Sequence, residues 1–171
     1  MKILGVDPGI GRTGWGIIEV QSSTLRRRSG QEFKVYDYGC IETEPNSPVE
    51  ERLLIINSEI EKIIKKYRPG ALSIEELFFS SNAKTAFIVG QARGVILLCA
   101  GKNKLPVAIY TPLQVKMALS GYGRADKNQI GQMVKIILGL STVPKIDDTT
   151  DALAVAITHG FSSKLNEQTK L

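Results

Sequence analysis

The 171 residues of this chain are enough for one domain with a buried core of ordinary size. Hydrophobic residues make up 43% and charged residues 23%, a balance that excludes an intrinsically disordered chain. The formal charge of +5 suits a polyanionic partner such as a nucleic acid, although many basic proteins bind nothing acidic.

Few residues are available for thiol or imidazole chemistry. Cys40 and Cys99 lie in apolar stretches without a paired spacing, so we expect two buried, reduced thiols. His159 is the single histidine, which leaves zinc clusters and Ser-His-Asp catalysis poorly supported. The first residues do not form a signal peptide, and the apolar stretch 87–100 is too short and polar to span a bilayer. We therefore expect a cytoplasmic protein.

The first third of the chain predicts an antiparallel meander followed by a helix. Apolar runs bounded by turn residues predict three strands, at residues 3–6, 15–20 and 33–41. Glycines mark the first connection, and a polar segment with Arg26–Arg28 forms the second. Ser47 with Glu50 forms a capping box with proline at the first helical position, and apolar residues then recur at helical spacing as far as Tyr67.

The remainder predicts helices and strands in alternation. We expect strands at 71–75 and 106–110, and helices at 82–102, at 111–119, from Asp126 onward and at 148–160. Asp126 and Gln129 form a second capping box, and the polar tail from Ser162 is expected to fray. The whole chain, 1–171, is interpreted as one α/β domain with a mixed five-stranded sheet flanked by helices. The ribonuclease H-like fold has this order of elements.

Four carboxylates could share one site in such a fold. Asp7 and Glu75 end the first and fourth strands, and ligands of open α/β sheets bind outside the carboxyl ends of strands. Asp148 and Asp151 are three residues apart at a helix start and therefore face one side. Clustered carboxylates need compensating charge, which two divalent cations about 4 Å apart would supply for in-line phosphodiester hydrolysis. Oxygen ligands favour Mg²⁺ or Mn²⁺ over zinc.

Each acid also has an ordinary structural explanation. Asp7 precedes Pro-Gly, a common turn, and either Glu75 or its neighbour Glu76 could be a solvated charge. Asp147, Asp148 and Asp151 are typical of a helix start, where they cap the helix and complement its dipole. The joint placement of the four acids favours a site more strongly than any one of them.

Several motifs resemble the RuvC family of Holliday junction endonucleases. They are collinear over nearly the whole chain: Gly5-Val6-Asp7-Pro8-Gly9, Thr13-Gly14-Trp15-Gly16, Ile74-Glu75-Glu76-Leu77-Phe78, Gly90-Gln91-Ala92-Arg93-Gly94, and Asp148-Thr149-Thr150-Asp151-Ala152-Leu153-Ala154. The last two are the most specific. Glu76 stands where the family often has glutamine, Asp147 adds an acid beside Asp148, and residues 21–32 form a longer connection than usual.

The resemblance implies a mechanism and partners. RuvC proteins are homodimers that nick two opposing strands of a four-way junction symmetrically and act with the RuvA and RuvB branch-migration proteins. The family's catalytic, metal-binding acids fall on Asp7, Glu75, Asp148 and Asp151. Functional lysines fall on Lys116 and Lys127, and a base-stacking aromatic falls at Phe78 or Phe79. We expect one of these two rings in the core and favour Phe78 as the one that meets DNA. Arg124 belongs to the same basic region and is a further candidate for DNA contact.

The helix predicted at 82–102 is a candidate for the dimer interface. Ala83, Ala86, Gly90 and Gly94 form a stripe of small residues at helical spacing, and glycine inside a helix costs up to ~1 kcal/mol, so it needs a packing reason. The alternative is packing of this stripe against the chain's own sheet.

Other classes of function remain to be weighed. An actin-like or sugar-kinase-like phosphate binder also begins with a strand, an acid and glycines, but it needs two such domains and 171 residues are too few. A DNA-binding module without catalysis would use the acids only as caps. An inactive or RNA-acting relative of the ribonuclease H-like group is a further alternative. Metal-dependent nicking of junction, duplex and RNA–DNA hybrid substrates distinguishes them.

Overall fold

One mixed β-sheet organises the fold. The structure, a computed structural model, describes residues 1–171 except 22–31, 77–82 and 169–171. In this part of the chain five strands form a sheet of order β3-β2-β1-β4-β5. The strands are β1 (Lys2–Asp7), β2 (Arg12–Val20), β3 (Phe33–Glu42), β4 (Ala71–Glu75) and β5 (Val107–Tyr110). The β1–β2 and β2–β3 pairs are antiparallel, whereas the β1–β4 and β4–β5 pairs are parallel, as the order of elements predicts.

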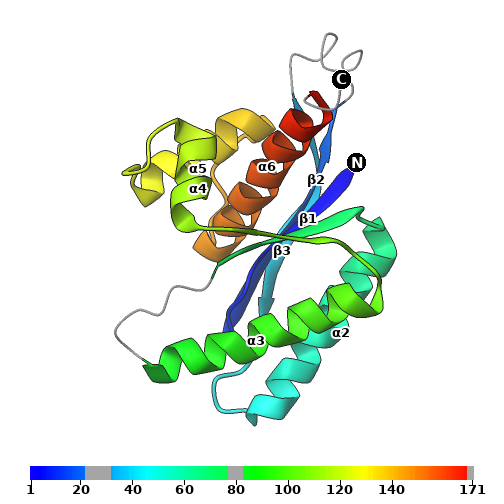
Figure 1. The fold of residues 1–171 in the computed structure, drawn as a ribbon. Coiled ribbons are helices and arrows are strands. Elements are labelled where there is room, and N and C mark those ends of the chain that lie inside the picture. Colours follow the sequence, from blue (N-terminus) through cyan, green and yellow to red (C-terminus); the bar gives the residue numbers. More distant parts are fainter. Residues whose placement is uncertain (22–31, 77–82, 169–171) are drawn as a thin grey trace.

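Helices cover both faces of this sheet (Figure 1). One layer consists of α2 (Val49–Tyr67) and α3 (Ala83–Lys102), and the other of α4 (Pro112–Ser120), α5 (Lys127–Leu138) and α6 (Asp147–Gln168). Successive residues of a strand point to opposite faces, so Ile3 packs in the α6 layer while Leu4 packs in the α2–α3 layer. The sheet therefore separates two apolar cores.

Helix starts agree with the sequence in two cases and differ in one. The Asp126–Gln129 capping box at the start of α5 is confirmed, and α4 carries a similar box between Thr111 and Gln114. The capping box predicted from Ser47 is wrong, because α2 begins at Val49 with Pro48 at the N-cap and without a side-chain cap. Proline has no side-chain hydrogen-bond acceptor, so Pro48 at the N-cap cannot cap the amides in the first turn of α2. Ser47, the cap predicted from the sequence, lies one residue before the N-cap.

The C-terminal helix is longer than its sequence suggests. We expected structure to fray from Ser162, but α6 continues to Gln168. Phe161 explains part of the extension, because its ring contacts Phe33 edge-on with 5.2 Å between ring centroids. The Ser162 hydroxyl also donates a hydrogen bond of 3.0 Å to the Thr158 carbonyl. The polar composition after Ser162 led us to predict fraying, because it gave no sign that Phe161 packs against Phe33.

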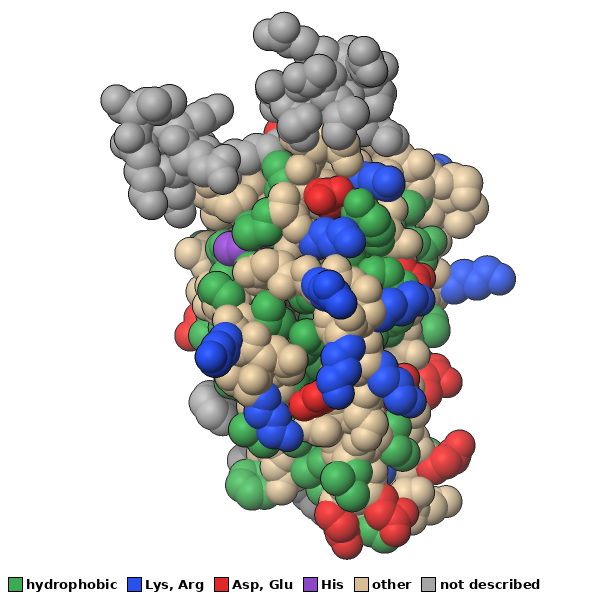
Figure 2. Space-filling model, turned by 90° about the vertical axis from the view of Figure 1, so that its right-hand side faces the viewer, with side chains coloured by type: hydrophobic (Ala, Val, Ile, Leu, Met, Phe, Trp, Pro, Cys, Tyr) green, Lys and Arg blue, Asp and Glu red, His purple; other side chains and the backbone are tan. Residues whose placement is uncertain are grey.

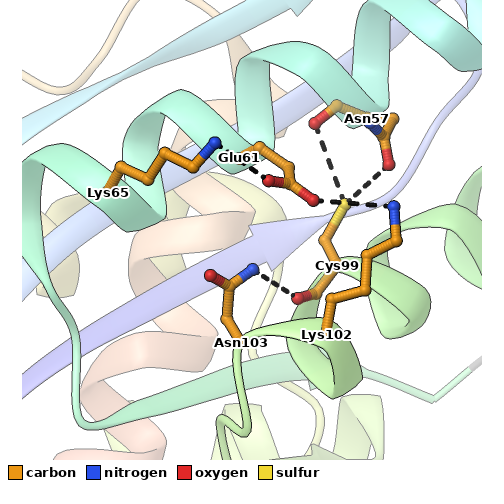
Figure 3. A network of polar contacts seen from close by, with 6 residues as sticks. All are labelled: Asn57, Glu61, Lys65, Cys99, Lys102 and Asn103. Carbon is orange, nitrogen blue, oxygen red and sulfur yellow. Dashed lines mark hydrogen bonds and ion pairs between the residues drawn. The ribbon is translucent and has the colours of Figure 1, made fainter.

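A polar network joins α2 to α3 (Figure 3). The buried Cys99 thiol lies 3.3 Å from the Asn57 side-chain oxygen, and Glu61 pairs with Lys65 on its own helix and with Lys102 on α3. Burial raises the pKa of Cys99, which keeps it a neutral thiol. Cys99 is buried as predicted, whereas Cys40 is only half-buried, so the expectation for that residue is wrong.

The opposite side of α3 is not covered by the rest of the described chain. A Cβ added at Gly90 or Gly94 would meet no described atom within 4 Å outside the backbone of α3 itself. Phe87 and Leu98, on the same face at spacings of three or four residues, are 70% and 55% exposed. Packing of the small-residue stripe against the chain's own sheet is thus wrong, since the sheet-facing residues of α3 are others, among them Ala92 and Ile96.

The surface carries the basic surplus of the sequence. Figure 2 shows lysine and arginine side chains gathered across the middle of one face, with acidic side chains at its lower edge. Some of the described lysines pair with acids, such as Lys62 with Glu59 at 2.7 Å. Among the described residues, no helix has the length and apolarity that crossing a bilayer requires.

Candidate active site at the carboxyl ends of β1 and β4

Asp7 and Glu75 lie on neighbouring parallel strands. Val6 pairs with Ile74 in the register of β1 and β4. Asp7 and Glu75 are the next residues on these two strands, so they lie at the same edge of the sheet. Both residues are half-buried, and both strands end there. The side-by-side placement that we predicted for the first and fourth strands is therefore present in the structure.

Three glycines bring α6 against this edge. Side chains on Gly5 and Gly14 would collide with the main-chain oxygens of Ala152 and Asp148, and one on Gly16 would collide with Leu153. Glycine is required here for close approach rather than for a turn. The strand predicted at 15–20 left Gly14 in the preceding connection, but β2 begins at Arg12 and includes both Gly14 and Gly16. The missing side chains let the first turns of α6 lie on β1 and β2.

This approach adds Asp148 and Asp151 to the cluster. Burial raises the pKa of Asp7 to about 7, and the charges of Asp151, Asp148 and Glu75 add to the effect. Burial also raises the pKa of Glu75 and of Asp151. All four acids that we predicted thus interact electrostatically, and the charged forms of Asp7, Glu75 and Asp151 are disfavoured unless a cation is near.

Two lysines face the acids across a cavity. Glu75, Asp151, Lys116 and Lys127 line it together with apolar residues of α4, α5 and α6. The Lys127 ammonium lies 3.2 Å from the Asp151 carboxylate and 3.3 Å from that of Asp147. Burial lowers the pKa of Lys127, but the Asp151 charge and its hydrogen bonds to both acids outweigh this, so the pKa is raised. Both predicted lysines are therefore beside the acids.

The acid cluster suits a hard cation in its chemistry. Carboxylate oxygens are the ligands that Mg²⁺ and Mn²⁺ prefer, and burial together with the charges of the other three acids raises the pKa of Asp7, an effect that a nearby cation would compensate. Within the described part of the chain, however, no three His, Cys, Asp or Glu side chains converge as a ready-made metal-binding set. Lys127 occupies one side of Asp151, so a metal-binding arrangement would require that ion pair to open.

The neighbouring acids differ from the cluster in exposure. Glu76 and Asp147 are exposed, while Glu75 and Asp148 are half-buried, which favours the assignments made from the sequence. Arg124 is exposed on the connection between α4 and α5 and does not line the cavity with Lys116 and Lys127. Phe78 and Arg26–Arg28 lie outside the described residues.

Two residues with structural roles at the site were missed by sequence reasoning. Arg93 donates from Nη1 to the Glu75 carbonyl at 2.6 Å, although it lies on α3. The Thr149 hydroxyl, from the first turn of α6, donates to the Gly39 carbonyl of β3 at 3.1 Å. Both residues belong to motifs that carried the family resemblance, but spacing alone gave no sign of their partners.

A sheet of this order, with α6 and its acids across the carboxyl ends of β1 and β4, defines the ribonuclease H-like class of fold. The model of one family, crossover junction endodeoxyribonuclease RuvC, matches residues 3–159. The chain belongs to the RuvC family.

Individual relatives agree over nearly the full length. The chain is 54% identical over 163 residues to a crossover junction endodeoxyribonuclease RuvC of Caldicellulosiruptor saccharolyticus, covering 95% of this chain and 94% of that one. A solved structure of Thermus thermophilus RuvC in complex with a Holliday junction substrate has a TM-score of 0.88 at 34% identity, covering 97% and 96%. The yeast mitochondrial Holliday junction resolvase Ydc2, at 12% identity and a TM-score of 0.63 (96% and 82% covered), shares the fold.

Proposed function

We propose that this chain is an endonuclease that resolves four-way DNA junctions by metal-dependent phosphodiester hydrolysis in recombination and repair. The observation that carries the proposal is the electrostatic interaction of Asp7 with Glu75, Asp148 and Asp151 where β1 and β4 end under α6. Membership of the RuvC family, and the relative solved with a Holliday junction substrate, supply the substrate class. We treat residues 1–171 as one domain that acts on DNA in the cytoplasm.

The four acids are proposed to hold two Mg²⁺ ions, with Mn²⁺ as a substitute. Bound ions would activate water and stabilise the leaving oxygen of the scissile phosphate. The half-buried Asp7 interacts with the other three acids and is the best placed to be shared between two ions. Asp148 and Asp151 contribute from one face of α6, and Glu75 contributes from β4. We assign no role in metal binding to Glu76 or Asp147, because both are exposed.

Lys116 and Lys127 are proposed to contact the substrate phosphate. Both line the cavity that Glu75 and Asp151 share, so their charges oppose the repulsion between the acids and DNA. Lys127 would exchange its ion pair with Asp151 for a phosphate contact when metal binds the acids. Its place in the first turn of α5 adds free backbone amides that favour an anion. Arg124 is proposed as a peripheral phosphate contact and Phe78 as the base-stacking aromatic.

The active enzyme is proposed to be a homodimer joined through α3. Gly90 and Gly94 leave room for close approach of a second helix, and the exposed Phe87 and Leu98 flank them. Two copies related by a two-fold axis would present two identical sites, which suits symmetric nicking of two strands. A stable dimer buries about 800 Å² per partner, more than one helix face alone, so neighbouring exposed residues such as Ile109 of β5 are expected to contribute. RuvA and RuvB are the further proposed partners, and we assign no surface of this chain to their binding.

A cleavage assay on matched substrates tests the proposal. Labelled four-way junction, linear duplex and RNA–DNA hybrid of the same sequence are incubated with the protein, with and without Mg²⁺. Symmetric nicks in the junction alone, dependent on metal, are expected. Preference for the hybrid would assign the chain to an RNA-acting class, and binding without cleavage in any metal would leave only a DNA-binding module.

A further inference from the structure

Glu75 is the last residue of β4, so its main-chain carbonyl lies at the end of the strand. Leu72 of β4 and Glu76, which follows β4, bond to the β5 side: the Leu72 amide donates to the Pro106 carbonyl at 2.9 Å and the Glu76 amide donates to the Tyr110 carbonyl at 2.8 Å. Peptide groups alternate in direction along a strand, so the carbonyl of Glu75 faces β1 instead. A regular parallel ladder would provide it with a donor from β1.

That donor is missing because of the sequence of β1. The last pair in the β1–β4 register joins Val6 to Ile74. If the ladder continued beyond Asp7, the next nitrogen to face the Glu75 carbonyl would be that of Pro8, which has no N–H. The proline that follows Asp7 thus ends the ladder and leaves a carbonyl at the site without its strand donor.

Arg93 satisfies this carbonyl from another element. Its Nη1 donates to the Glu75 oxygen at 2.6 Å, and the half-buried guanidinium comes from α3. Because the guanidinium is charged and rigid, the bond is stronger and more directional than one from a neutral donor. Burial lowers the pKa of Arg93, and the charge of the exposed Glu76 opposes this shift. The pKa of Glu75 is raised by burial first and by Asp151, with Lys116 and Lys127 opposing, so Arg93 acts on the main chain of Glu75 rather than on its ionisation.

We propose that Arg93 is a positioning residue for the metal site: it replaces the missing Pro8 donor and fixes the end of β4, so that the Glu75 carboxylate faces Asp7 and Asp151. The inference rests on the proposed function, in which Glu75 is a metal ligand. Arg93 also lies between Gly90 and Gly94 in the sequence of α3. It therefore connects the helix of the proposed dimer interface to the carboxylate edge of the sheet.

Direct metal titration tests this inference. Mn²⁺ affinity is measured by calorimetry on the full chain without DNA, for the wild type, R93M and R93K. K102M is the matched control, because it removes an exposed cation from the same helix without touching β4. Titrations are made below the lowest thermal midpoint, and R93Q, whose side chain is too short to reach, replaces R93M if R93M does not fold. Junction affinity in EDTA and single-turnover cleavage complete the set.

The expected result is a loss of about tenfold or more in Mn²⁺ affinity for R93M, as is typical when the support of a metal ligand is removed. R93K, which keeps a donor, should recover most of this loss, while K102M and the junction affinity in EDTA stay at wild-type values. Wild-type Mn²⁺ affinity in R93M, or equal losses in R93M and R93K, would overturn the inference. E75Q separates the two proposals: if it binds Mn²⁺ and cleaves normally, the metal site itself is misassigned, whereas failure of Arg93 alone leaves that site standing.

Discussion

The ammonium of Lys127 lies 3.2 Å from the carboxylate of Asp151, which ties the first turn of α5 to the first turns of α6. One lysine thus compensates an acid that the proposed mechanism assigns to a metal ion. The pair is partly exposed, so solvent screens it and it can open when a stronger cation binds. Under the proposed mechanism, the Lys127 side chain would then become available to the substrate.

Replacing Lys127 by alanine should therefore lower the rate more than the affinity. If Lys127 stabilises charge on the phosphate in the transition state, the single-turnover rate at saturating enzyme falls, as does that of Lys116→Ala. A lysine that only binds phosphate would instead flatten the salt dependence of junction affinity by about one unit at unchanged turnover. Lys145→Ala, a basic residue that does not line the cavity, serves as the control. Wild-type rates for both lysine variants would contradict the proposal.

The metal-free protein should lose stability as the pH rises towards 7. The pKa of Asp7 is about 7 in the folded state against an ordinary 3.8, so the folded chain binds more protons between these values. The stability present below about pH 4 falls through this window, by at most about 4 kcal/mol for this one group. Asp7→Asn should reduce the slope in thermal midpoint against pH, measured in EDTA, and Glu75 and Asp151, whose pKa values are also raised, should account for part of what remains. An unchanged slope in that variant would show that Asp7 titrates normally.

The same substitution should abolish cleavage and leave junction binding largely intact. Asp7 interacts with the three other acids, so its loss removes a metal ligand, whereas phosphate contacts made elsewhere supply most of the affinity. Gel-shift titration in Ca²⁺ and cleavage in Mg²⁺ measure the two effects separately. Near-normal cleavage by Asp7→Asn would refute the assignment of the site.

Cleavage should require Mg²⁺ or Mn²⁺, and Ca²⁺ should support binding without turnover. Calcium takes more ligands at longer distances and so spoils the geometry that two close ions need. Because acid repulsion grows with pH, Mg²⁺ should raise the thermal midpoint more at pH 8 than at pH 5. Cleavage that persists in excess EDTA would exclude a metal mechanism.

Glu75→Gln should inactivate the enzyme, and Glu76→Gln should not. Glu75 is half-buried and lines the cavity with Asp151, whereas Glu76 is exposed. The pair forms a close internal control, since both changes remove one charge from adjacent positions. Cleavage lost in Glu76→Gln and kept in Glu75→Gln would reverse the assignment.

Gly90→Leu should convert the proposed dimer to a monomer. A Cβ added at this position meets no neighbouring atom of the described residues within 4 Å, so a change in assembly would come from the partner surface. Gly101→Leu is the matched control, as it adds the same side chain to another open position on α3. Light scattering gives the mass of each variant. If Gly90→Leu stays dimeric, the interface lies elsewhere.

Periodicity was enough to predict the strands that carry Asp7 and Glu75, because apolar runs and turn residues mark where β1 and β4 end. It could not predict how closely α6 approaches the sheet. Gly14 and Gly16 have two physical explanations, a turn or a close contact, and only the positions of Asp148 and Leu153 against the strands decide between them. The contact of Lys127 with Asp151 was also hidden, since it joins two helices whose packing no local pattern encodes.

The bond from Arg93 to Glu75 shows a different limit. It depends on an amide that Pro8 lacks, on a register between β1 and β4, and on a helix from elsewhere in the chain. The sequence alone cannot reveal this bond, because the missing Pro8 amide matters only when the strand register and the position of α3 are both known. The resemblance to a family drew attention to the segment around Arg93, but its physical reason lies in the sheet.

The glycines beneath α6 also determine when a site can exist during synthesis of the chain. Asp7 belongs to β1, whereas Asp148 and Asp151 belong to α6, the last helix of the described residues. A nascent chain can form the β1–β2 hairpin long before α6 has left the ribosome, and it then holds only part of the proposed ligand set. Such an enzyme would be harmless to DNA while it is still being made, because the activity begins only when α6 docks onto Gly5, Gly14 and Gly16.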